Sequence, residues 1–328
     1  MSAPDIAVTR KITVDQALRG RRVDVAGVVF MSMLLLCLLI CLLFIMVLVG
    51  TVLADGWGTI QGRGTDFLTS DLSRCAADPC GISSLKPAGV AQGIFGSAVL
   101  AVLVALVAFP LGVATAIYLE EYARDNRLTR FVKLNIRNLS GVPSVVYGLL
   151  GLAVFVQILG TNRGDGGGLT GGRTLVSGGV TLAILVLPIV IITASEAIRA
   201  VPQSLREGGY GVGATKWEVT RRLVLPNAFA GILTGTVLSL SRALGETAPL
   251  ILVGAFYGTF FTTGNDSILE RLDTTYTALP MIVFQWATEA EAEFNTDLAA
   301  AAIIVLLTIT LLANLTAVLL RNRYEKRW

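Results

Sequence analysis

The sequence predicts an all-α protein that crosses a membrane six times. Of its 328 residues 54% are hydrophobic and only 15% are charged, whereas soluble domains carry about 25% charged residues. Five uncharged stretches are each long enough to span a bilayer core of roughly 30 Å as a helix. A sixth long apolar stretch contains only two charges. Because there is no histidine, His-based metal sites and Ser-His-Asp triads are excluded.

The predicted spans follow these apolar stretches in order. The five uncharged stretches are residues 25–54, 87–119, 138–162, 174–195 and 298–320. The remaining long stretch, 223–265, is the fifth span in chain order and is interrupted by Arg242 and Glu246. One more stretch, 274–288, is short for a span, so it is predicted to be interfacial or re-entrant.

The spans divide the chain into predicted regions. Residues 1–24 form a cytoplasmic tail, 25–54 the first helix and 55–89 an extracytoplasmic loop. The remaining five helices fall within 90–320, and 321–328 form a second tail. The first stretch is far longer than the 7–15 apolar residues of a signal peptide, so it is predicted to be a retained helix.

The distribution of basic residues predicts the orientation. With the amino terminus inside, 19 lysines and arginines fall in inner segments and six in outer segments. Inner segments of membrane proteins carry the excess of positive charge. Both termini are therefore predicted to be cytoplasmic, in the plasma membrane. The net charge of +3 is too small to favour nucleic acid as a partner. The surroundings that the apolar stretches predict are membrane lipid.

The inner loop 199–226 is the longest and carries a motif. Ser204 and Glu207 have the spacing of a capping box, which predicts a short helix beginning after Ser204. Gly211 and Gly213 are expected to end or bend this helix.

A second short helix is predicted over residues 216–224. Trp217, Val219 (or Thr220) and Leu223 are expected to form its apolar stripe. Pro226 then marks the beginning of the fifth span.

The loop resembles the "EAA" loop of ABC importer permeases, through Glu207-Gly208-Gly209, Gly213 and Leu225-Pro226. In that family this loop is the coupling helix that docks on a cytoplasmic ATPase, and the resemblance gives these residues that role. The family usually has two alanines where this chain has Gly208-Gly209, which lowers helix propensity by about 1 kcal/mol per glycine. The alternative is an ordinary amphipathic inner loop.

Two further stretches narrow the resemblance. Residues 241–249, Ser-Arg-Ala-Leu-Gly-Glu-Thr-Ala-Pro, and residues 278–284 resemble the PstA phosphate permease subunits. PstC subunits carry a related Arg-Ala-x-Gly-Glu-Thr but typically lack the Ala-Pro, and residues 140–148 resemble both. The likeness covers roughly residues 90 to 320.

The resemblance implies a type I ABC importer permease fold and a role in phosphate import. It also implies three partners: a PstC-like permease, a PstB-like ATPase dimer and a PstS-like extracytoplasmic binding protein. The chain has no Walker A sequence, so ATP and Mg²⁺ are expected on the ATPase. The chain itself is then a prokaryotic transport subunit with no cofactor and no enzymatic activity.

Arg242 and Glu246 are the candidate residues of the substrate path. On a helix, residues four apart share one face, and a charge inside the bilayer costs about 2.5–3.5 kcal/mol, so both should face protein or water. Either they neutralise each other and fix helix packing, or Arg242 offers a guanidinium fork to an oxyanion, as the resemblance implies. Gly245 would let a ligand approach, and Pro249 would open the helix one turn later.

Glu246 bears on the choice of anion. A carboxylate repels a dianion that has no proton, such as sulfate, but can accept a hydrogen bond from hydrogen phosphate. The open alternatives are phosphonate, sulfate or molybdate as substrate, or a self-contained secondary transporter or channel. A membrane-embedded enzyme lacks a catalytic constellation.

Cys75 and Cys80 are predicted to form a disulfide. Both lie in the external loop, and the Ala-Ala-Asp-Pro between them favours a turn. A metal site is disfavoured, because two thiols without histidine supply too few soft ligands.

If the disulfide forms, a membrane-impermeant thiol reagent should label the mature protein only after reduction. Labelling of Cys75 and Cys80 without reductant would contradict the disulfide.

Overall fold

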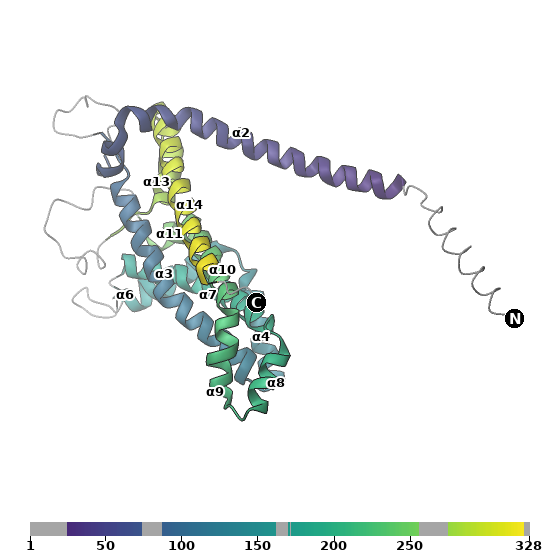
Figure 1. The fold of residues 1–328 in the computed structure, drawn as a ribbon. Helices are drawn as coiled ribbons and strands as arrows, with labels where there is room; N and C mark the ends of the chain where they lie inside the picture. Colours follow the sequence, from purple (N-terminus) through teal and green to yellow (C-terminus); the bar gives the residue numbers. More distant parts are fainter. Residues whose placement is uncertain (1–24, 74–86, 162–169, 171, 256–274, 325–328) are drawn as a thin grey trace, which may run out of the picture. The chain divides into compact units, whose positions relative to one another are not determined.

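The structure is a computed structural model that describes residues 25–73, 87–161, 170, 172–255 and 275–324 (Figure 1). All regular elements in these ranges are helical. They are α2 (Val25–Thr69), α3 (Ala91–Ile117), η1 (Tyr118–Tyr122), α4 (Arg127–Ser140), α5 (Ser144–Gly151), η2 (Leu152–Ile158), α6 (Leu159–Thr161), α7 (Leu175–Arg199), α8 (Gln203–Gly211), α9 (Lys216–Val219), η3 (Thr220–Val224), α10 (Leu225–Gly245), α11 (Ala248–Val253), α13 (Leu279–Ala287), η4 (Glu293–Leu298) and α14 (Ala299–Tyr324). The four η elements are π-helical turns.

The described helices match the predicted all-α membrane fold. Five of them are long and apolar enough to cross a membrane, and the bent pair formed by α4 and α5–η2 makes six if it is counted as one span. The segment before the last span contains α13, whose nine residues are too short to cross a bilayer. This agrees with the prediction for residues 274–288.

The two outermost helices are longer than the sequence indicated. Helix α2 continues to Thr69, so residues 55–69 are helical and not part of a loop, with a break at Gly64 (φ 49°). Helix α14 continues to Tyr324, so the first four residues of the predicted tail 321–328 are helical. A charge such as Asp55 ends an apolar stretch without ending a helix. Arg321 and Arg323 in fact suit the carboxyl end of α14. Cys75 and Cys80 lie outside the described residues.

Helix α2 is divided between two compact units, residues 1–51 and 52–328. Within the first unit, residues 25–51 form an apolar helix whose side chains are almost all exposed. Within the second unit, α2 packs against α14: a Cβ atom added at Gly56 would lie 2.7 Å from the backbone of Ala300 and Ala301. All further description concerns the second unit.

The third predicted span is bent, which corrects the continuous helix expected over 138–162. Helix α4 ends at Ser140 and α5 begins at Ser144, and the two helical segments meet at 100°. Pro143 disfavours helical backbone at the residue before it, which explains the break. The Tyr147 hydroxyl donates a hydrogen bond to the Leu139 carbonyl oxygen at 2.8 Å and bridges the two sides of the bend.

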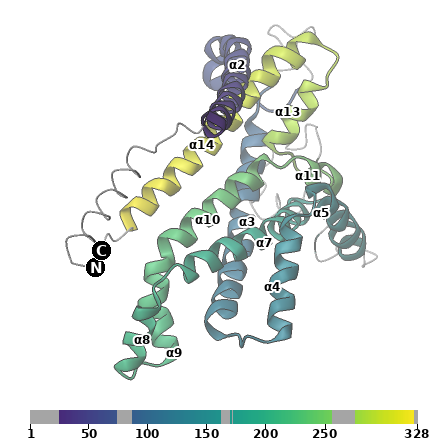
Figure 2. The same ribbon diagram turned by 90° about the vertical axis from the view of Figure 1, so that its right-hand side faces the viewer.

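Helix α7 is the most buried of the candidate spans. It begins with a capping box between Thr174 and Ser177 and packs between α3 and α10 (Figure 2). Small residues permit the close approach, as is common between membrane helices. A Cβ at Gly112 of α3 would lie 2.6 Å from Val190, and one at Gly231 of α10 would lie 2.7 Å from Ala197.

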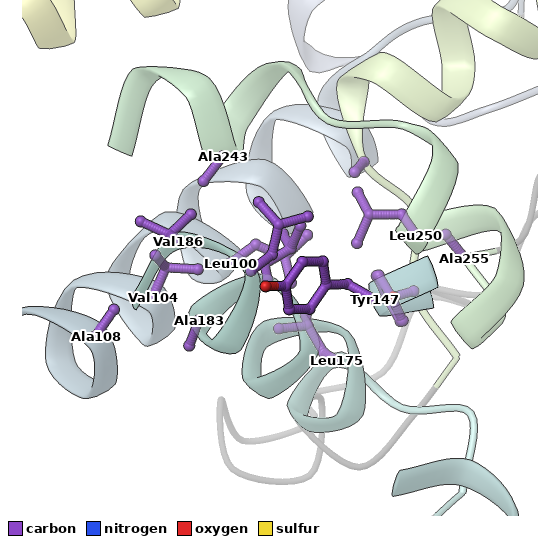
Figure 3. Close-up of a cluster of buried hydrophobic side chains, with 14 of the residues drawn as sticks. Leu100, Val104, Ala108, Tyr147, Leu175, Ala183, Val186, Ala243, Leu250 and Ala255 are labelled. Atoms are coloured by element: carbon purple, nitrogen blue, oxygen red, sulfur yellow. The ribbon is translucent and has the colours of Figure 1, made fainter. Parts of the chain in front are cut away.

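A buried apolar cluster joins α5, α7 and α11 beside the end of α10. Tyr147 from α5 lies with Leu175 from α7 and Leu250 from α11 (Figure 3). Helices α5 and α11 come close because α5 presents Gly148, where an added Cβ would lie 2.7 Å from the Cα atom of Pro249. The position of α11 therefore depends on the absence of a side chain at Gly148.

We expect Gly148→Ala to lower the midpoint temperature of thermal unfolding of the detergent-purified protein. Overpacking costs about 1–3 kcal/mol, which outweighs the roughly 1 kcal/mol gained from helix propensity. Gly141→Ala is the matched control, because an added Cβ there meets only the Asn138 carbonyl oxygen at an ordinary 3.5 Å. Equal midpoints for the two variants would contradict the close α5–α11 packing.

Candidate functional site

The residues singled out in the sequence fall in two separate places. Arg242, Gly245 and Glu246 lie where α10 ends and α11 begins. Glu207, Gly208, Gly209 and Gly213 lie in the hairpin formed by α8 and α9 (Figure 2). Leu225 and Pro226 lie where this hairpin leads into α10.

The helix that carries Arg242 is broken directly after Gly245. Glu246 has extended backbone (φ −79°, ψ 119°), and the next helix begins at Ala248. The ring of a proline clashes with the carbonyl of the fourth residue before it, which for Pro249 is Gly245. The helix therefore breaks between Gly245 and Ala248, before Pro249 is reached. The sequence suggested that Glu246 lies on the face of a helix together with Arg242, and it does not.

Arg242 and Glu246 nevertheless form an ion pair. Arg242 Nε lies 3.3 Å from Glu246 Oε1. The Arg242 side chain is 55% exposed and that of Glu246 is 17% exposed, while an added Cβ at Gly245 would meet no atom within 4 Å. The pair therefore borders open space on the face of the chain that presents Arg242.

The other side of this helix end is closed. Ala243 and Leu244 are buried and line an apolar cavity together with Leu100 and Leu182. Ser241 forms a hydrogen bond to Asn314 of α14, which fixes the last turn of α10. The arginine is thus held at the carboxyl end of a helix, where its positive charge suits the helix dipole.

The helices of the α8–α9 hairpin are not capped where the sequence predicted. Helix α8 begins at Gln203, directly after Pro202, and the expected capping box between Ser204 and Glu207 is not formed. The capping box is at Thr215 and Glu218 instead, where Thr215 N donates to Glu218 Oε2 at 2.9 Å. Pro202 occupies the N-cap position with a φ of −58°, one that suits the start of a helix, and it has no side-chain acceptor for the N–H groups of the first turn.

The turn of the hairpin depends on Gly213. Its φ of 81° is in the left-handed region, which a side chain disfavours. Gly213 N donates to the Tyr210 carbonyl oxygen at 2.9 Å, and Ala214 N donates to that of Gly209 at 3.1 Å. These bonds satisfy carbonyls at the end of α8 and reverse the chain.

The two glycines that replace the usual alanines have different surroundings. A Cβ at Gly209 would lie 2.8 Å from Val219 and 2.9 Å from Leu223, so α8 packs directly on the second helix there. Gly208 is exposed and meets nothing within 4 Å, and Glu207 beside it is exposed as well. Glu207 and Gly208 thus lie on the outward side of the hairpin.

The predicted apolar stripe is wrong at Trp217. Val219 and Thr220 are fully buried, but Trp217 is 56% exposed. Trp217 and Val219 are two positions apart, and side chains at that spacing on a helix point about 160° away from each other. Trp217 belongs to an exposed set on the hairpin, which we call the hairpin face: Leu205, Tyr210, Val212 and Trp217.

Sequence reasoning missed two glutamates at the end of α3. Glu120 accepts two hydrogen bonds from Arg199, at 2.7 and 3.0 Å, and lies 3.1 Å from Lys133 Nζ. Glu121 pairs with Arg206 of α8. The signal was present, because these are adjacent acidic residues in an otherwise basic inner segment.

A further, exposed ion pair lies just before and within α4. Arg130 forms two hydrogen bonds to Asp125, at 3.0 and 2.9 Å, and both side chains are 74% exposed. These hydrogen bonds lower the pKa of the Asp125 carboxyl below its ordinary value. In the described part of the chain no group of three or more acidic or cysteine side chains is placed to hold a metal ion.

Comparisons with known proteins agree with this architecture. The family model described as "Binding-protein-dependent transport system inner membrane component" matches residues 108–327. The sequence is 38% identical over 165 residues to the probable ABC transporter permease protein YqgH of Bacillus subtilis, and this match spans about half of each chain.

Two longer matches are to phosphate transport system permease proteins. PstC of Mesorhizobium japonicum is 31% identical over 287 residues, covering 82% of this chain and 83% of that protein. PstA of Xylella fastidiosa is 30% identical over 267 residues, covering 81% and 85%.

A solved structure shares the fold. It is a bacterial alginate ABC transporter in complex with an alginate pentasaccharide-bound periplasmic protein, and it matches with a TM-score of 0.60. The match covers 92% of this chain and 96% of that one, at 15% identity. The family model and the long matches at 30% identity or more show that the chain belongs to the family of binding-protein-dependent transport system inner membrane components, the permeases of ABC importers.

Proposed function

We propose that this chain is one of two permease subunits of an ATP-driven importer of inorganic phosphate. The observation that carries the proposal is the Arg242–Glu246 pair, which borders open space at a helix break. In this proposal Arg242 binds the anion, Gly245 leaves room for it, and Glu246 discriminates between anions.

The exposure of Arg242 is informative because α10 belongs to a candidate membrane span. A charged side chain that faces lipid is costly, so its exposed face needs water or another protein. Backbone that leaves a helix inside a membrane is likewise tolerated only where it lines a cavity or is covered by protein. Both arguments support the proposal that the pair borders a water-filled path, shared with a second permease subunit.

The geometry of the pair favours an oxyanion that still carries a proton. The Nε atom of Arg242 lies 3.3 Å from Glu246 and the side chain is 55% exposed, so its guanidinium can offer N–H groups side by side to the oxygen atoms of an anion. Glu246 then lies where hydrogen phosphate could donate to it, whereas sulfate has no proton to donate. Phosphonate, sulfate and molybdate remain the alternative substrates.

The names of the relatives support phosphate. Both long matches are named phosphate transport system permease proteins, one PstC and one PstA. Ala248-Pro249 after Glu246-Thr247 favours the PstA type for this chain. The expected partners are then a PstC-like permease and a PstS-like extracytoplasmic binding protein.

We assign coupling to the α8–α9 hairpin. Glu207, Gly208 and the hairpin face of Leu205, Tyr210, Val212 and Trp217 form an exposed surface on which an ATPase subunit can dock. Exposed aromatic and aliphatic side chains of this kind are typical of a protein interface. ATP and Mg²⁺ would be bound by a PstB-like ATPase, with both termini of this chain on the same cytoplasmic side of the plasma membrane and no cofactor in the chain itself.

Substitution of Arg242 tests the substrate path. Arg242→Lys keeps the charge but loses the planar fork, so phosphate uptake by the reconstituted importer should fall about tenfold. Arg242→Ala should lower uptake further, because Glu246 would then present an uncompensated negative charge. Arg130→Ala, at the exposed pair with Asp125, is the control and should retain uptake.

The double variant Arg242→Ala with Glu246→Ala separates transport from packing. If the pair only stabilises the helices, removing both charges should restore uptake, since no unpaired charge remains. If Arg242 binds the anion, uptake should stay low although the importer assembles normally. Recovery to near wild-type uptake, normalised to the amount of protein in the membrane, would refute the assignment.

Substitution in the hairpin tests the ATPase contact. Gly213→Val forces a β-branched residue into left-handed backbone, so it should weaken co-purification of the ATPase, as should the charge reversal Glu207→Lys. Gly211→Val is the matched control, because Gly211 also has open space around it but no positive φ. Normal co-purification and normal ATP-driven uptake with both test variants would contradict the coupling role.

A further inference from the structure

A buried ion pair connects the hairpin to the membrane helices. Arg206 of α8 donates two hydrogen bonds to Glu121 Oε1, from Nε at 3.1 Å and from Nη2 at 2.9 Å. The side chains are only 12% and 5% exposed, the lowest pair of values among the ion pairs of the described chain. The pair lies 85 residues apart in sequence and joins η1, at the end of α3, to α8.

The same guanidinium also binds the end of α7. Arg206 Nη1 donates to the Val201 carbonyl oxygen at 2.7 Å, and Nη2 donates to that of Ile198 at 2.8 Å. Carbonyls at the carboxyl end of a helix lack partners further along the helix, and the guanidinium supplies donors to two of them. The Ile198 carbonyl also accepts a longer bond, of 3.3 Å, from Val201 N. One planar group thus holds α8, α7 and the end of α3 in a fixed mutual geometry.

The neighbouring glutamate extends this network. Glu120 binds Arg199 of α7 and Lys133 of α4, while Glu121 binds α8. The two glutamates are consecutive residues of η1, and consecutive helical residues point about 100° apart, so they reach partners on different elements. A polar groove lined by Glu121, Arg206, Tyr210 and Lys216 lies beside the pair, so continuous apolar packing does not fill the space between η1 and the hairpin.

The positions of Arg206 and Glu207 in α8 indicate how a force on the hairpin could be transmitted by the Arg206–Glu121 ion pair. Glu207 is exposed on the outward side of α8, whereas the residue before it is fixed to the membrane helices. A force applied to the outward side of α8 can therefore reach α3 and α7 through Arg206, in addition to the apolar contacts that Val219 and Val224 make in one cluster with residues of α3 and α7. Four hydrogen bonds from one rigid fork resist rotation of α8 more than a single-point contact would.

We propose that Arg206 and Glu121 form the link that converts movement of the hairpin into movement of α3 and α7. Arg206 is a positioning residue in this scheme, since it contacts neither the anion nor the nucleotide. The proposal rests on the proposed function, because it requires an ATPase that moves the hairpin.

The test compares ATP hydrolysis with phosphate uptake. The importer is reconstituted in vesicles with its ATPase, second permease and binding protein, and carries Arg206→Gln, Arg206→Lys or Glu121→Gln. We expect the complex to stay assembled while the number of ATP molecules hydrolysed per phosphate imported rises about tenfold, as for loss of a charge-assisted hydrogen bond. Arg206→Lys should be affected too, because an ammonium group cannot reach all three acceptors at once.

Two comparisons make the result specific. Arg130→Gln removes the fork from the exposed pair with Asp125 and should leave the ratio unchanged. The double variant Arg206→Gln with Glu121→Gln should be no worse than either single variant, because each alone already breaks the link. An unchanged ratio in assembled complexes, or uptake and hydrolysis falling in parallel, would overturn the proposal.

A distance measurement separates this proposal from the proposed function. Spin labels at Ser204→Cys of α8 and Glu196→Cys of α7, both exposed, report the distance between the two elements without any need for phosphate transport. We expect one narrow distance distribution with and without ATP in the otherwise wild-type complex, and a broad one in Arg206→Gln. Equal widths would overturn the link, whereas absence of phosphate uptake by the wild-type complex would overturn only the proposed function.

Discussion

The rest of this structure depends on close contact between helices. This contact is possible because the helices carry no large side chains where they cross. Between membrane helices the hydrophobic effect adds little, so packing requires backbones to approach each other. Gly112 and Gly231 provide this on either side of α7, and Gly148 provides it between α5 and α11. Because α7 is held in this way, its two ends become fixed points for the proposed anion site and for the hairpin.

The broken helix at Glu246 follows from the same packing. Pro249 prevents α10 from continuing, and α11 is then directed against α5 by the contact between Gly148 and Pro249. The break leaves Arg242 half exposed on one side, while Ala243 and Leu244 are buried on the other. A charged pair is thereby presented to open space by a helix that is otherwise well anchored.

The sequence was sufficient for the spans and for the two candidate regions, since long apolar stretches and an isolated charge pair are local signals. It was insufficient where the outcome depends on contacts between distant segments. The extension of α2 to Thr69, the burial of Gly209 against Val219 and the pairing of Glu121 with Arg206 all involve partners that no local pattern reveals. Local reasoning also failed for the capping box, because α8 begins at Gln203, directly after Pro202, and Ser204 therefore lies inside the helix and not at its N-cap.

The π-helical turn at Tyr118–Tyr122 makes the number of residues, more than their identity, the constraint at this end of α3. Each residue advances an α-helix by about 100°, so deletion of one residue within the turn would rotate Glu120 and Glu121 away from their three partners at once. An exchange of glutamate for aspartate would shorten the reach but leave the direction intact. Among relatives of this protein, insertions and deletions should therefore accumulate on either side of this turn and be absent within it.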